Sequence, residues 1–515
     1  MFSKTFAAID VGSFELSMKI YEVSKHSGMR QIDHIRHNID MGTETYANGL
    51  LSFERVADLC DTLREFKSIM DSYKVETYKA YGTSAIRETK NMAILIDQVE
   101  QKTGIHIDVL SNSEQRFLDY KSIASQGEQF EKLIEQGTAI LDIGGGSIQM
   151  SLFDEHTLIS TQNMKLGVLR LRDRMKTLNA SIRQYEHFID ELTDSQLSTY
   201  KRLYLEDRKI QNLIVVDDYV SLVVNNKNSV GYNISNTASL DDINRYIDMV
   251  ISNNRQDISK AMSISDDDIS LLYISLLLTR NVMLTTGANR IWVPGVSLCD
   301  GIAYEYADNI GLMSTNHDFE ADIIACSKEI SNRYMGSNQR SKTLEQIALN
   351  LFDTIKDISG LTQRDKLLLR ISAILHDCGK YVSMLNLAEC SYNIIKNTEI
   401  IGLSHKERLI VANTVKYNQV VFKYFDELIS NEGLDRADHK RIAKLTAILR
   451  IANGLDRSHK MKFKDVQTQV LNNELLITIE TDEDISLEKG LFGTRAGFFE
   501  EVYNLKPIIK QKRSF

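Results

Sequence analysis

Two short stretches of this chain combine an aspartate, glycines and a serine in the same order. The first reads Asp10-Val11-Gly12-Ser13 and the second reads Asp142-Ile143-Gly144-Gly145-Gly146-Ser147. A glycine-rich turn lets backbone N–H groups approach an anion closely, and a serine adds a hydroxyl donor. An aspartate at the end of a strand can hold a hydrated Mg²⁺ or orient a water. We therefore predict that the two loops grip a polyphosphate from both sides of a cleft.

Each stretch lies between an apolar run and a series of alternating apolar residues. This pattern is typical of a strand, a tight turn and a second strand. The two aspartates are 132 positions apart (142 − 10), which is too far for a solenoid repeat and suits two duplicated subdomains that face each other. Either stretch alone is compatible with an ordinary hairpin, but the repetition with the same aspartate offset favours phosphate binding.

The composition restricts the classes of function. The chain has 515 residues and a net charge of −9, so we expect two to four globular domains and neither a nucleic-acid nor a membrane-surface partner. The five cysteines are widely spread without a CxxC pair, which is typical of a reduced, cytoplasmic protein. We also expect no signal peptide, and the longest apolar run, 269–278, is too short to span a bilayer.

The pattern along the chain predicts an α/β protein with a separate helical part. We predict one α/β subdomain over 1–125 and a second over 126–315, a helical domain over 316–463 and an α+β segment over 464–515. In the first subdomain the expected helices are 53–72 and 91–103 and the expected strands are 75–81 and 105–110. In the helical domain the expected helices are 319–334, 341–358, 363–377, 405–416, 419–430 and 437–454.

The order of these motifs resembles the Ppx/GppA family of exopolyphosphatases and guanosine pentaphosphate phosphohydrolases, in its long form. The likeness covers essentially the whole chain. It rests on the two loops and on residues 82–88, 110–115, 165–167, 300–304, 374–380 and 449–459. The resemblance implies duplicated ribonuclease H-like subdomains of the actin-like ATPase superfamily, a C-terminal HD-like domain and a homodimer. It also implies release of the terminal phosphate of polyphosphate, or of the 5′ phosphate of pppGpp, by Mg²⁺-assisted water attack.

The resemblance further implies roles for individual residues. Arg87 would clamp a phosphate with its guanidinium fork. Asp142 would organise Mg²⁺ or the attacking water, and Asp10 would be a second Mg²⁺ ligand. The residues expected to cradle phosphate oxygens are Gly12, Ser13, Thr83, Ser84, Gly144, Gly145, Gly146 and Ser147.

Several positions depart from the family pattern. Phe14 and Glu15 replace two polar donors, Gln115 stands where the general-base glutamate is expected, and Gln149 replaces a carboxylate. A glutamine cannot accept a proton usefully near neutral pH, so Glu114 is the candidate base if the helix start is shifted by one residue. The remaining departures are 214–219 in place of a Gly-Gly-Thr loop and Cys299-Asp300 in place of an Arg-Glu pair.

The helical domain departs as well. Metal-dependent HD phosphohydrolases gather several histidine and aspartate ligands from different helices. His376 and Asp377 remain here, whereas Cys390, Asn418 and Asn453 stand where longer family members have other ligands. Two adjacent ligands cannot fill a metal shell of about four to six positions, so we expect a metal-free, structural domain.

Three functions stay open at this point. The first is a working exopolyphosphatase or pppGpp phosphohydrolase, with Glu114 or another group as base. The second is a non-catalytic relative that binds polyphosphate or guanosine tetraphosphate and reports it to a partner. The third is a structural or assembly role for the helical half. Family resemblance favours the first function, while Gln115 and Gln149 favour the second.

Overall fold

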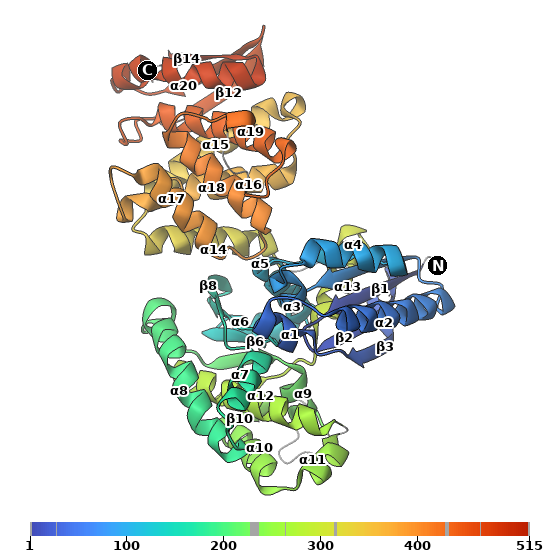
Figure 1. The fold of residues 1–515 in the computed structure, drawn as a ribbon. Helices are drawn as coiled ribbons and strands as arrows, with labels where there is room; N and C mark the ends of the chain where they lie inside the picture. Colours follow the sequence, from blue (N-terminus) through green and yellow to red (C-terminus); the bar gives the residue numbers. More distant parts are fainter. Residues whose placement is uncertain are drawn as a thin grey trace. The chain divides into compact units, whose positions relative to one another are not determined.

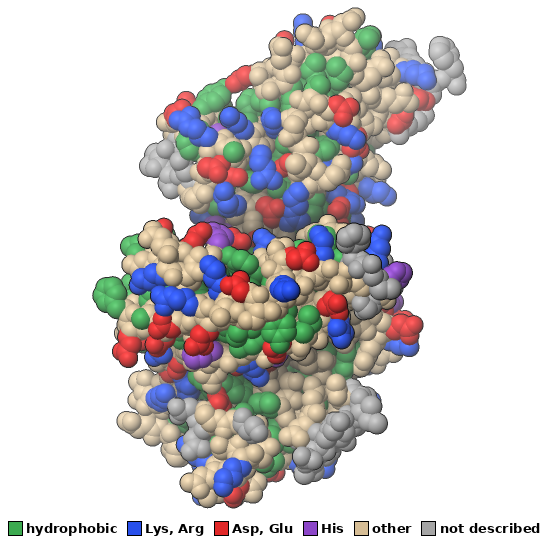
Figure 2. All heavy atoms as spheres, turned by 90° about the vertical axis from the view of Figure 1, so that its right-hand side faces the viewer, with side chains coloured by type: hydrophobic (Ala, Val, Ile, Leu, Met, Phe, Trp, Pro, Cys, Tyr) green, Lys and Arg blue, Asp and Glu red, His purple; other side chains and the backbone are tan. Residues whose placement is uncertain are grey.

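The chain folds into two compact units, Met1–Phe319 and Glu320–Phe515 (Figure 1). The computed structural model describes residues 3–26, 28–226, 236–262, 264–313, 317–427, 432–463 and 465–512. Among the described residues on the face drawn in Figure 2, acidic and basic side chains are interspersed. Such mixing is unlike the continuous basic band with which proteins follow a nucleic-acid backbone.

The first lobe of the first unit is a sheet covered by helices on both faces. Its five strands have the order β3-β2-β1-β4-β5. Alternate residues of β1 face opposite layers, because side chains alternate along a strand: Ala7 and Ile9 pack with α2 and α4, whereas Phe6 and Ala8 pack with α13. The elements are β1 (Lys4–Val11), β2 (Glu15–Ser24), β3 (Gly28–Asn38), α1 (Met41–Asn48), α2 (Phe53–Ser72), β4 (Thr77–Gly82), α3 (Ser84–Glu88), α4 (Met92–Thr103), β5 (Asp108–Val109) and α5 (Asn112–Ala124).

The second lobe repeats the strand order of the first. Its sheet reads β10-β11-β9-β6-β7-β8, so β8-β7-β6-β9-β11 corresponds to β3-β2-β1-β4-β5. In both lobes the first three strands are antiparallel hairpins and the fourth pairs in parallel with the first. The duplicated α/β subdomains are thereby confirmed. The strands are β6 (Thr138–Ile143), β7 (Ile148–Asp154), β8 (Thr157–Met164), β9 (Asn212–Val216), β10 (Thr237–Ser239) and β11 (Arg290–Trp292).

One helix, α12 (Asp266–Thr286), forms the centre of the second lobe. Its stretch Asp268–Thr286 is long and apolar enough to cross a membrane by length and composition, but 78% of its apolar window is buried inside the protein. A core helix of a large lobe has this composition because it is covered all round. The remaining helices here are α6 (Glu128–Ile134), α7 (Val168–Thr177), α8 (Ile182–Tyr200), η1 (Lys201–Leu205), α9 (Asp218–Val224), α10 (Leu240–Ser252) and α11 (Arg255–Met262).

After β11 the chain returns to the first lobe. Helix α13 (Leu298–Asn309) packs against the first sheet, where Ile302 and Ala303 share a core cluster with Phe6 and Leu118. The predicted segment 126–315 therefore ends in a helix that packs on the other lobe. The unit boundary, at Phe319, lies four residues (319 − 315) after the end of that predicted segment.

The second unit is mainly helical. Its helices are α14 (Phe319–Arg333, which begins in the first unit), α15 (Asn338–Ser359), α16 (Gln363–Ile374), η2 (Cys378–Tyr381), α17 (Leu387–Asn397), α18 (His405–Gln419), η3 (Phe425–Glu427) and α19 (Arg436–Leu455). The predicted helix over 419–430 is wrong for its described part, and 428–431 lie outside the described residues. The physical reason is that Arg450 binds the carbonyls of Tyr417 and Val420 and so ends α18.

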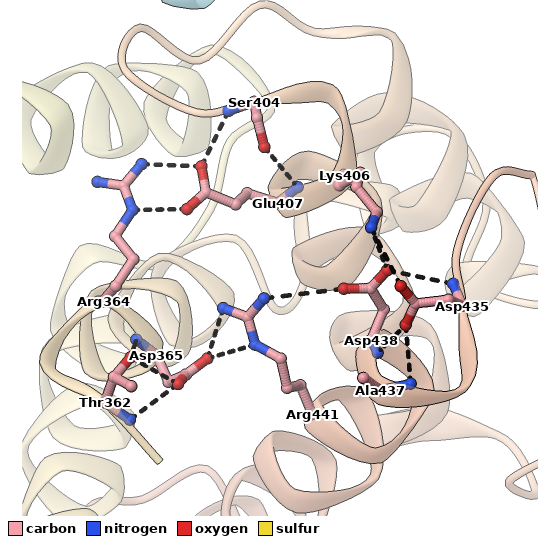
Figure 3. Close-up of polar contacts among 10 residues, drawn as sticks. All are labelled: Thr362, Arg364, Asp365, Ser404, Lys406, Glu407, Asp435, Ala437, Asp438 and Arg441. Atoms are coloured by element: carbon pink, nitrogen blue, oxygen red, sulfur yellow. Dashed lines mark hydrogen bonds and ion pairs between the residues drawn. The ribbon is translucent and has the colours of Figure 1, made fainter. Parts of the chain in front are cut away.

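Carboxylates at the starts of three helices tie this unit together (Figure 3). Asp365, Glu407 and Asp438 each close a capping box at the N-terminus of their own helix, α16, α18 or α19. Each carboxylate also pairs with an arginine. Arg364 of α16 binds Glu407 of α18 through two contacts of 2.6 and 2.8 Å. Arg441 of α19 lies 2.7 Å from Asp365 of α16 and 3.8 Å from Asp438 of its own helix. Each helix start is therefore stabilised both locally and by ion pairing.

The C-terminal segment confirms the predicted return to β structure. Its sheet, β12-β13-β14, has an antiparallel first pair and a parallel second pair. The middle strand is β13 (Glu474–Glu480), and helix α20 (Ser486–Tyr503) follows it in the chain. The other strands are β12 (Asp465–Leu471) and β14 (Lys506–Lys512).

Candidate phosphate site

The two aspartate-glycine turns each contain the same type of backbone hydrogen bond, which closes the turn. Gly12 N–H donates to the Glu15 carbonyl (3.0 Å), and Gly144 N–H donates to the Ser147 carbonyl (2.9 Å). A Cβ atom on Gly12 would lie 2.6 Å from that Glu15 carbonyl oxygen, so only glycine fits there. Asp10 therefore stands beside its turn in the first lobe as Asp142 does in the second.

The carbonyl groups of the second loop are bound by the start of α7. Gly167 makes this approach possible, because a Cβ atom there would lie 2.3 Å from the Gly145 carbonyl oxygen. The contacts are Val168 N–H to Gly144 O (3.1 Å), Leu169 N–H to Gly145 O (3.0 Å) and Arg170 Nε–H to Gly146 O (2.7 Å). These three contacts hold the loop against the start of α7.

Three hydroxyl groups of the first lobe lie against this loop. Ser13 Oγ is 2.7 Å from the Tyr46 hydroxyl and 2.7 Å from Ser84 Oγ, and Tyr46 is 2.8 Å from Ser84. A Cβ atom on Gly146 would be 2.5 Å from the Tyr46 oxygen. The structure thus brings the predicted Ser13 and Ser84 together with the second glycine loop. It adds Tyr46 of α1, which no sequence pattern indicated.

Arg170 links the two lobes at the same place. Its guanidinium group lies 4.0 Å from the centre of the Tyr46 ring and pairs with Glu88 at the end of α3. Arg172 makes a second link through a 2.7 Å contact to Asp40. These two arginines were not predicted from the sequence. The signal for Arg170 is its position in the first turn of α7, directly after Gly167, the glycine that contacts the second loop.

Buried carboxylates gather beside the loops. Burial, reinforced by Asp218 and Asp142, raises the pKa of Asp10 to about 8. Burial raises the pKa of Asp142 to about 6, with Arg116 opposing the shift. Burial and the neighbouring carboxylates, Asp142 first among them, hold the pKa of Asp119 well above its ordinary value. This cluster therefore retains protons near neutral pH unless a cation compensates its charge.

Asp10 and Asp142 suit a water-rich divalent cation. Asp10 Oδ1 is buried and makes no hydrogen bond, and magnesium prefers carboxylate oxygens while keeping several waters. Throughout the described ranges, however, no group of three His, Cys, Asp or Glu side chains is arranged to hold a metal ion. Most ligands of a cation here would thus be water and phosphate oxygens.

Arg87 and Thr83 lie at the edge of the same site, on and before α3. Arg87 donates to the carbonyl of Leu110 (2.6 Å), just before α5. Thr83 is buried and its hydroxyl donates to the carbonyl of Val11 (3.4 Å), under the first loop. The phosphate contacts of both residues stay predictions.

Glu114, the candidate base, and the two glutamines that replace expected carboxylates, Gln115 and Gln149, have different surroundings. Glu114 accepts a hydrogen bond from Ser111 N–H (3.0 Å) and closes the capping box of α5, so its carboxylate is committed to the helix start. Gln115 Oε1 is buried without a hydrogen bond. Gln149 accepts from Arg116 Nε (2.7 Å). Asp119, one helical turn after Gln115, is the carboxyl on α5 that reaches Asp142.

The unusual end of the first loop is accommodated between the lobes. Glu15 pairs with Arg36 of β3 at 2.7 Å, and Arg36 also lies 3.5 Å from Asp218 of α9. Phe14 packs against the core of the second lobe. Arg36 therefore offsets the charge of Glu15, so Glu15 repels phosphate oxygens less than an unpaired carboxylate would.

The other departures have structural partners. Asp300 caps α13 and accepts hydrogen bonds from Lys19 and Tyr21, each at 2.7 Å, and Cys299 is fully buried beside β1. Asp217 caps α9 through Val220 N–H (2.6 Å). Neither segment therefore supplies the phosphate donors that the family pattern has there.

A cavity of about 700 Å³ lies away from these loops. Asn212 and Arg290, which begin β9 and β11, contribute to its lining. Asp142 instead pairs with Val216 at the far end of β9. The cavity is therefore at the opposite end of the second sheet and takes no part in the phosphate site.

A duplicated α/β fold with an aspartate-glycine turn after the first strand of each half is an actin-like ATPase fold. The chain belongs to the Ppx/GppA phosphatase family. The family's model matches residues 19–309, and that of Ppx/GppA phosphatase, domain III, matches 325–493. The predicted family and its hydrolase class are confirmed.

Individual relatives are distant. A guanosine-5′-triphosphate,3′-diphosphate pyrophosphatase of Vibrio vulnificus is 21% identical over 80% of both chains. A bifunctional 3-dehydroquinate synthase/phosphatase of Fusobacterium nucleatum is 23% identical over 42% of this chain, which spans only 31% of that longer protein. The structure of an exopolyphosphatase from Cytophaga hutchinsonii has a TM-score of 0.50 and 19% identity, covering 60% of this chain and all of that one.

Proposed function

We propose that the protein releases the terminal phosphate of inorganic polyphosphate or of pppGpp with the help of Mg²⁺. The observation that carries this proposal is the meeting of the hydroxyls of Ser13, Tyr46 and Ser84 with the Gly146 loop beside two buried carboxylates. Hydrogen-bond donors on one side can bind phosphate oxygens, and carboxylates on the other side can bind a cation that neutralises part of the phosphate charge. The two substrates are those named for relatives, a guanosine pentaphosphate pyrophosphatase and an exopolyphosphatase.

In this proposal each group has a limited task. The N–H groups of Gly145 and Gly146 and the three hydroxyls hold oxygens of the terminal phosphate, while Gly144 N–H stays bound to the Ser147 carbonyl, and Arg87 holds the next phosphate. Asp10 and Asp142 hold the ion, which neutralises charge on the phosphate oxygens when it is bound. Asp142, with its pKa of about 6, orients the attacking water. We place this reaction in the cytoplasm and in a homodimer.

A second function has its own support. Gln115 lacks a carboxylate, and Glu114 is engaged as a helix cap. Loss of a general base typically removes about 10² to 10⁴ of the rate, whereas phosphate binding survives it. A protein that binds polyphosphate or guanosine tetraphosphate and reports it to a partner is therefore the alternative.

Phosphate release from polyphosphate and pppGpp, measured with and without Mg²⁺, tests the proposal. We expect wild-type turnover and its loss in Asp142→Asn. If Glu114→Gln abolishes turnover, Glu114 is the base despite its capping role; if Asp119→Asn does so, the base lies one turn further along α5. An inactive wild type that Gln115→Glu activates would establish the binding function instead. Absence of calorimetric binding of both substrates in the presence of Mg²⁺ would refute both functions.

A further inference from the structure

A guanidinium group occupies the centre of the helical unit. Arg340, at the start of α15, lies beside the His376-Asp377 pair that the sequence suggested as remnants of an HD metal site. Its Nη1 is 3.9 Å from Asp377 Oδ2, and its Nε is 3.7 Å from Asp456 Oδ2. His376 Nε2 lies 3.8 Å from the same oxygen of Asp377. The arginine therefore stands among the side chains that would surround a metal ion.

This cluster is almost closed to solvent. Arg340 is 7% exposed, Asp377 5%, Asp456 2% and His376 0%. A buried charge needs compensation, and here the Arg340 guanidinium faces two carboxylates, one of which, Asp377, also binds Lys380 at 3.1 Å. Asp377 and Asp456 in turn help to keep Arg340 charged, because their negative charge opposes the lowering of its pKa by burial.

Two of the three positions that lost expected ligands, Asn418 and Asn453, belong to the same cluster. Arg340 Nη2 donates to Asn453 Oδ1 (2.9 Å), and Asn453 Nδ2 donates to Asn418 Oδ1 (3.4 Å). Arg495 Nη1 donates to the Asn418 carbonyl (2.7 Å). An amide oxygen accepts these donors without adding charge. The replaced ligands are thus partners of the arginine, directly or through one amide.

We propose that Arg340 is a built-in cation that replaces the metal ion of an HD-type centre. A divalent ion at this place would meet the guanidinium at short range, and the remaining donors, His376, Asp377 and Asp456, are already arranged around the arginine. The unit consequently holds its core together without metal and performs no HD-type hydrolysis. This inference concerns the second unit alone and does not depend on the proposed phosphate chemistry of the first.

Metal content provides the first test. Wild-type, His376→Gln and Asp142→Asn full-length proteins are equilibrated with Mn²⁺ or Zn²⁺, desalted, and analysed by inductively coupled plasma mass spectrometry. We expect the metal content of His376→Gln to equal that of the wild type. One equivalent of metal that His376→Gln removes and Asp142→Asn leaves in place would overturn the proposal.

Stability provides the second test. Arg340→Met, which keeps the length and removes the charge, is expected to lower the unfolding midpoint of the helical unit by about 10 °C. Asp456→Asn in the same chain should recover part of this loss, because it removes the carboxylate that loses its Arg340 partner, whereas Asp377 keeps Lys380 at 3.1 Å. Strictly additive effects of the two changes would overturn the charge-replacement role. Arg340→Lys should lose less than Arg340→Met, since it keeps the charge.

A matched control lies in the same unit. Arg364 pairs with Glu407 through two contacts of 2.6 and 2.8 Å, but its side chain is 38% exposed (Figure 3). Arg364→Met should therefore lower the midpoint clearly less than Arg340→Met, because water partly replaces the lost partner. Equal losses in the two variants would show that Arg340 is an ordinary ion-pair residue, and the proposal would fail.

Discussion

The hydroxyl of Tyr46, in the first lobe, takes the place of a side chain on Gly146 in the second, 2.5 Å from where a Cβ atom would stand. A tyrosine of one lobe and a glycine of the other are thus in close contact where the hydroxyl cluster meets the glycine loop. The absence of a side chain at Gly146 is what allows this first-lobe hydroxyl to lie against the glycine loop of the second lobe.

Tyr46→Phe tests whether this hydroxyl contacts substrate. A hydrogen bond to a charged group contributes about 1.5 to 3 kcal/mol, so kcat/KM for phosphate release should fall by about 10-fold or more. Steady-state kinetics on both substrates measures the effect. Tyr73→Phe is the control, because Tyr73 binds only Asp33 at the surface and should leave kcat/KM unchanged. Equal kinetics for Tyr46→Phe and the wild type would remove Tyr46 from the site.

Gly167→Ala should disable the second loop. The new methyl group would overlap the Gly145 carbonyl and the Ser147 N–H, each 2.3 Å away. The backbone must shift, and we expect a loss of stability of about 2 kcal/mol together with loss of substrate binding by calorimetry. Gly490→Ala has open space and lies within α20, so it should instead be neutral or stabilising by up to about 1 kcal/mol. Unchanged binding by Gly167→Ala would contradict the role given to the loop.

The buried carboxylates predict an unusual dependence of stability on pH. The pKa values of Asp10 (about 8) and Asp142 (about 6) lie above the unfolded value of 3.8, so the folded first unit binds protons that the unfolded chain releases. Its stability should therefore increase as the pH falls from about 8 toward 4. Added Mg²⁺ should flatten this dependence. Thermal unfolding of the first unit across this range measures it, and a midpoint that rises with pH would contradict the assignment.

Asp10→Asn separates stability from activity. It removes a buried carboxylate whose ionisation is unfavourable, and each unit of pKa difference corresponds to about 1.4 kcal/mol. At pH 8 the variant should be more stable than the wild type by about 1 to 3 kcal/mol and should lose Mg²⁺-dependent phosphate release. Chemical denaturation and a phosphate assay on the same samples give both numbers. A less stable variant at pH 8 would show that the charge of Asp10 is compensated.

Arg441→Met tests the network of helix starts in the second unit. It leaves Asp365, whose side chain is 4% exposed, without its 2.7 Å partner. We expect a loss of about 1 to 3 kcal/mol in denaturant unfolding. Arg436→Met changes a pair whose side chains are 67% and 75% exposed and should cost less than about 1 kcal/mol. The same loss in both would mean that burial of Asp365 does not matter.

Local patterns predicted the framework of the site correctly. The repeated apolar run, aspartate and glycine specified the turns β1–β2 and β6–β7, and helical spacing specified α2 with the bounds that the structure has. The role of Glu114 was also readable: Ser111-Asn112-Ser113-Glu114 is the sequence signature of a capping box. That signature competes with a catalytic role and would have lowered the expectation placed on Glu114.

Long-range partners were beyond the sequence. No pattern in α1 indicates that Tyr46 reaches Ser84, 38 positions later, because their contact depends on how two helices meet. The same holds for Arg340, which precedes Asn453 by 113 positions. The predicted helix over 419–430 was wrong in its described part because the group that binds the carbonyls at the end of α18, Arg450, comes from another helix. Tertiary contacts override local spacing at each of these places.

The return of α13 to the first sheet determines how the two lobes can separate. The polypeptide passes from the first lobe to the second before β6 and comes back after β11. Two covalent crossings favour rotation about the line that joins them and oppose sliding of one loop past the other. Entry of a long polyanion would then require rotation of the two lobes about this line. The Arg170–Glu88 ion pair, which joins the lobes, would have to break during this rotation.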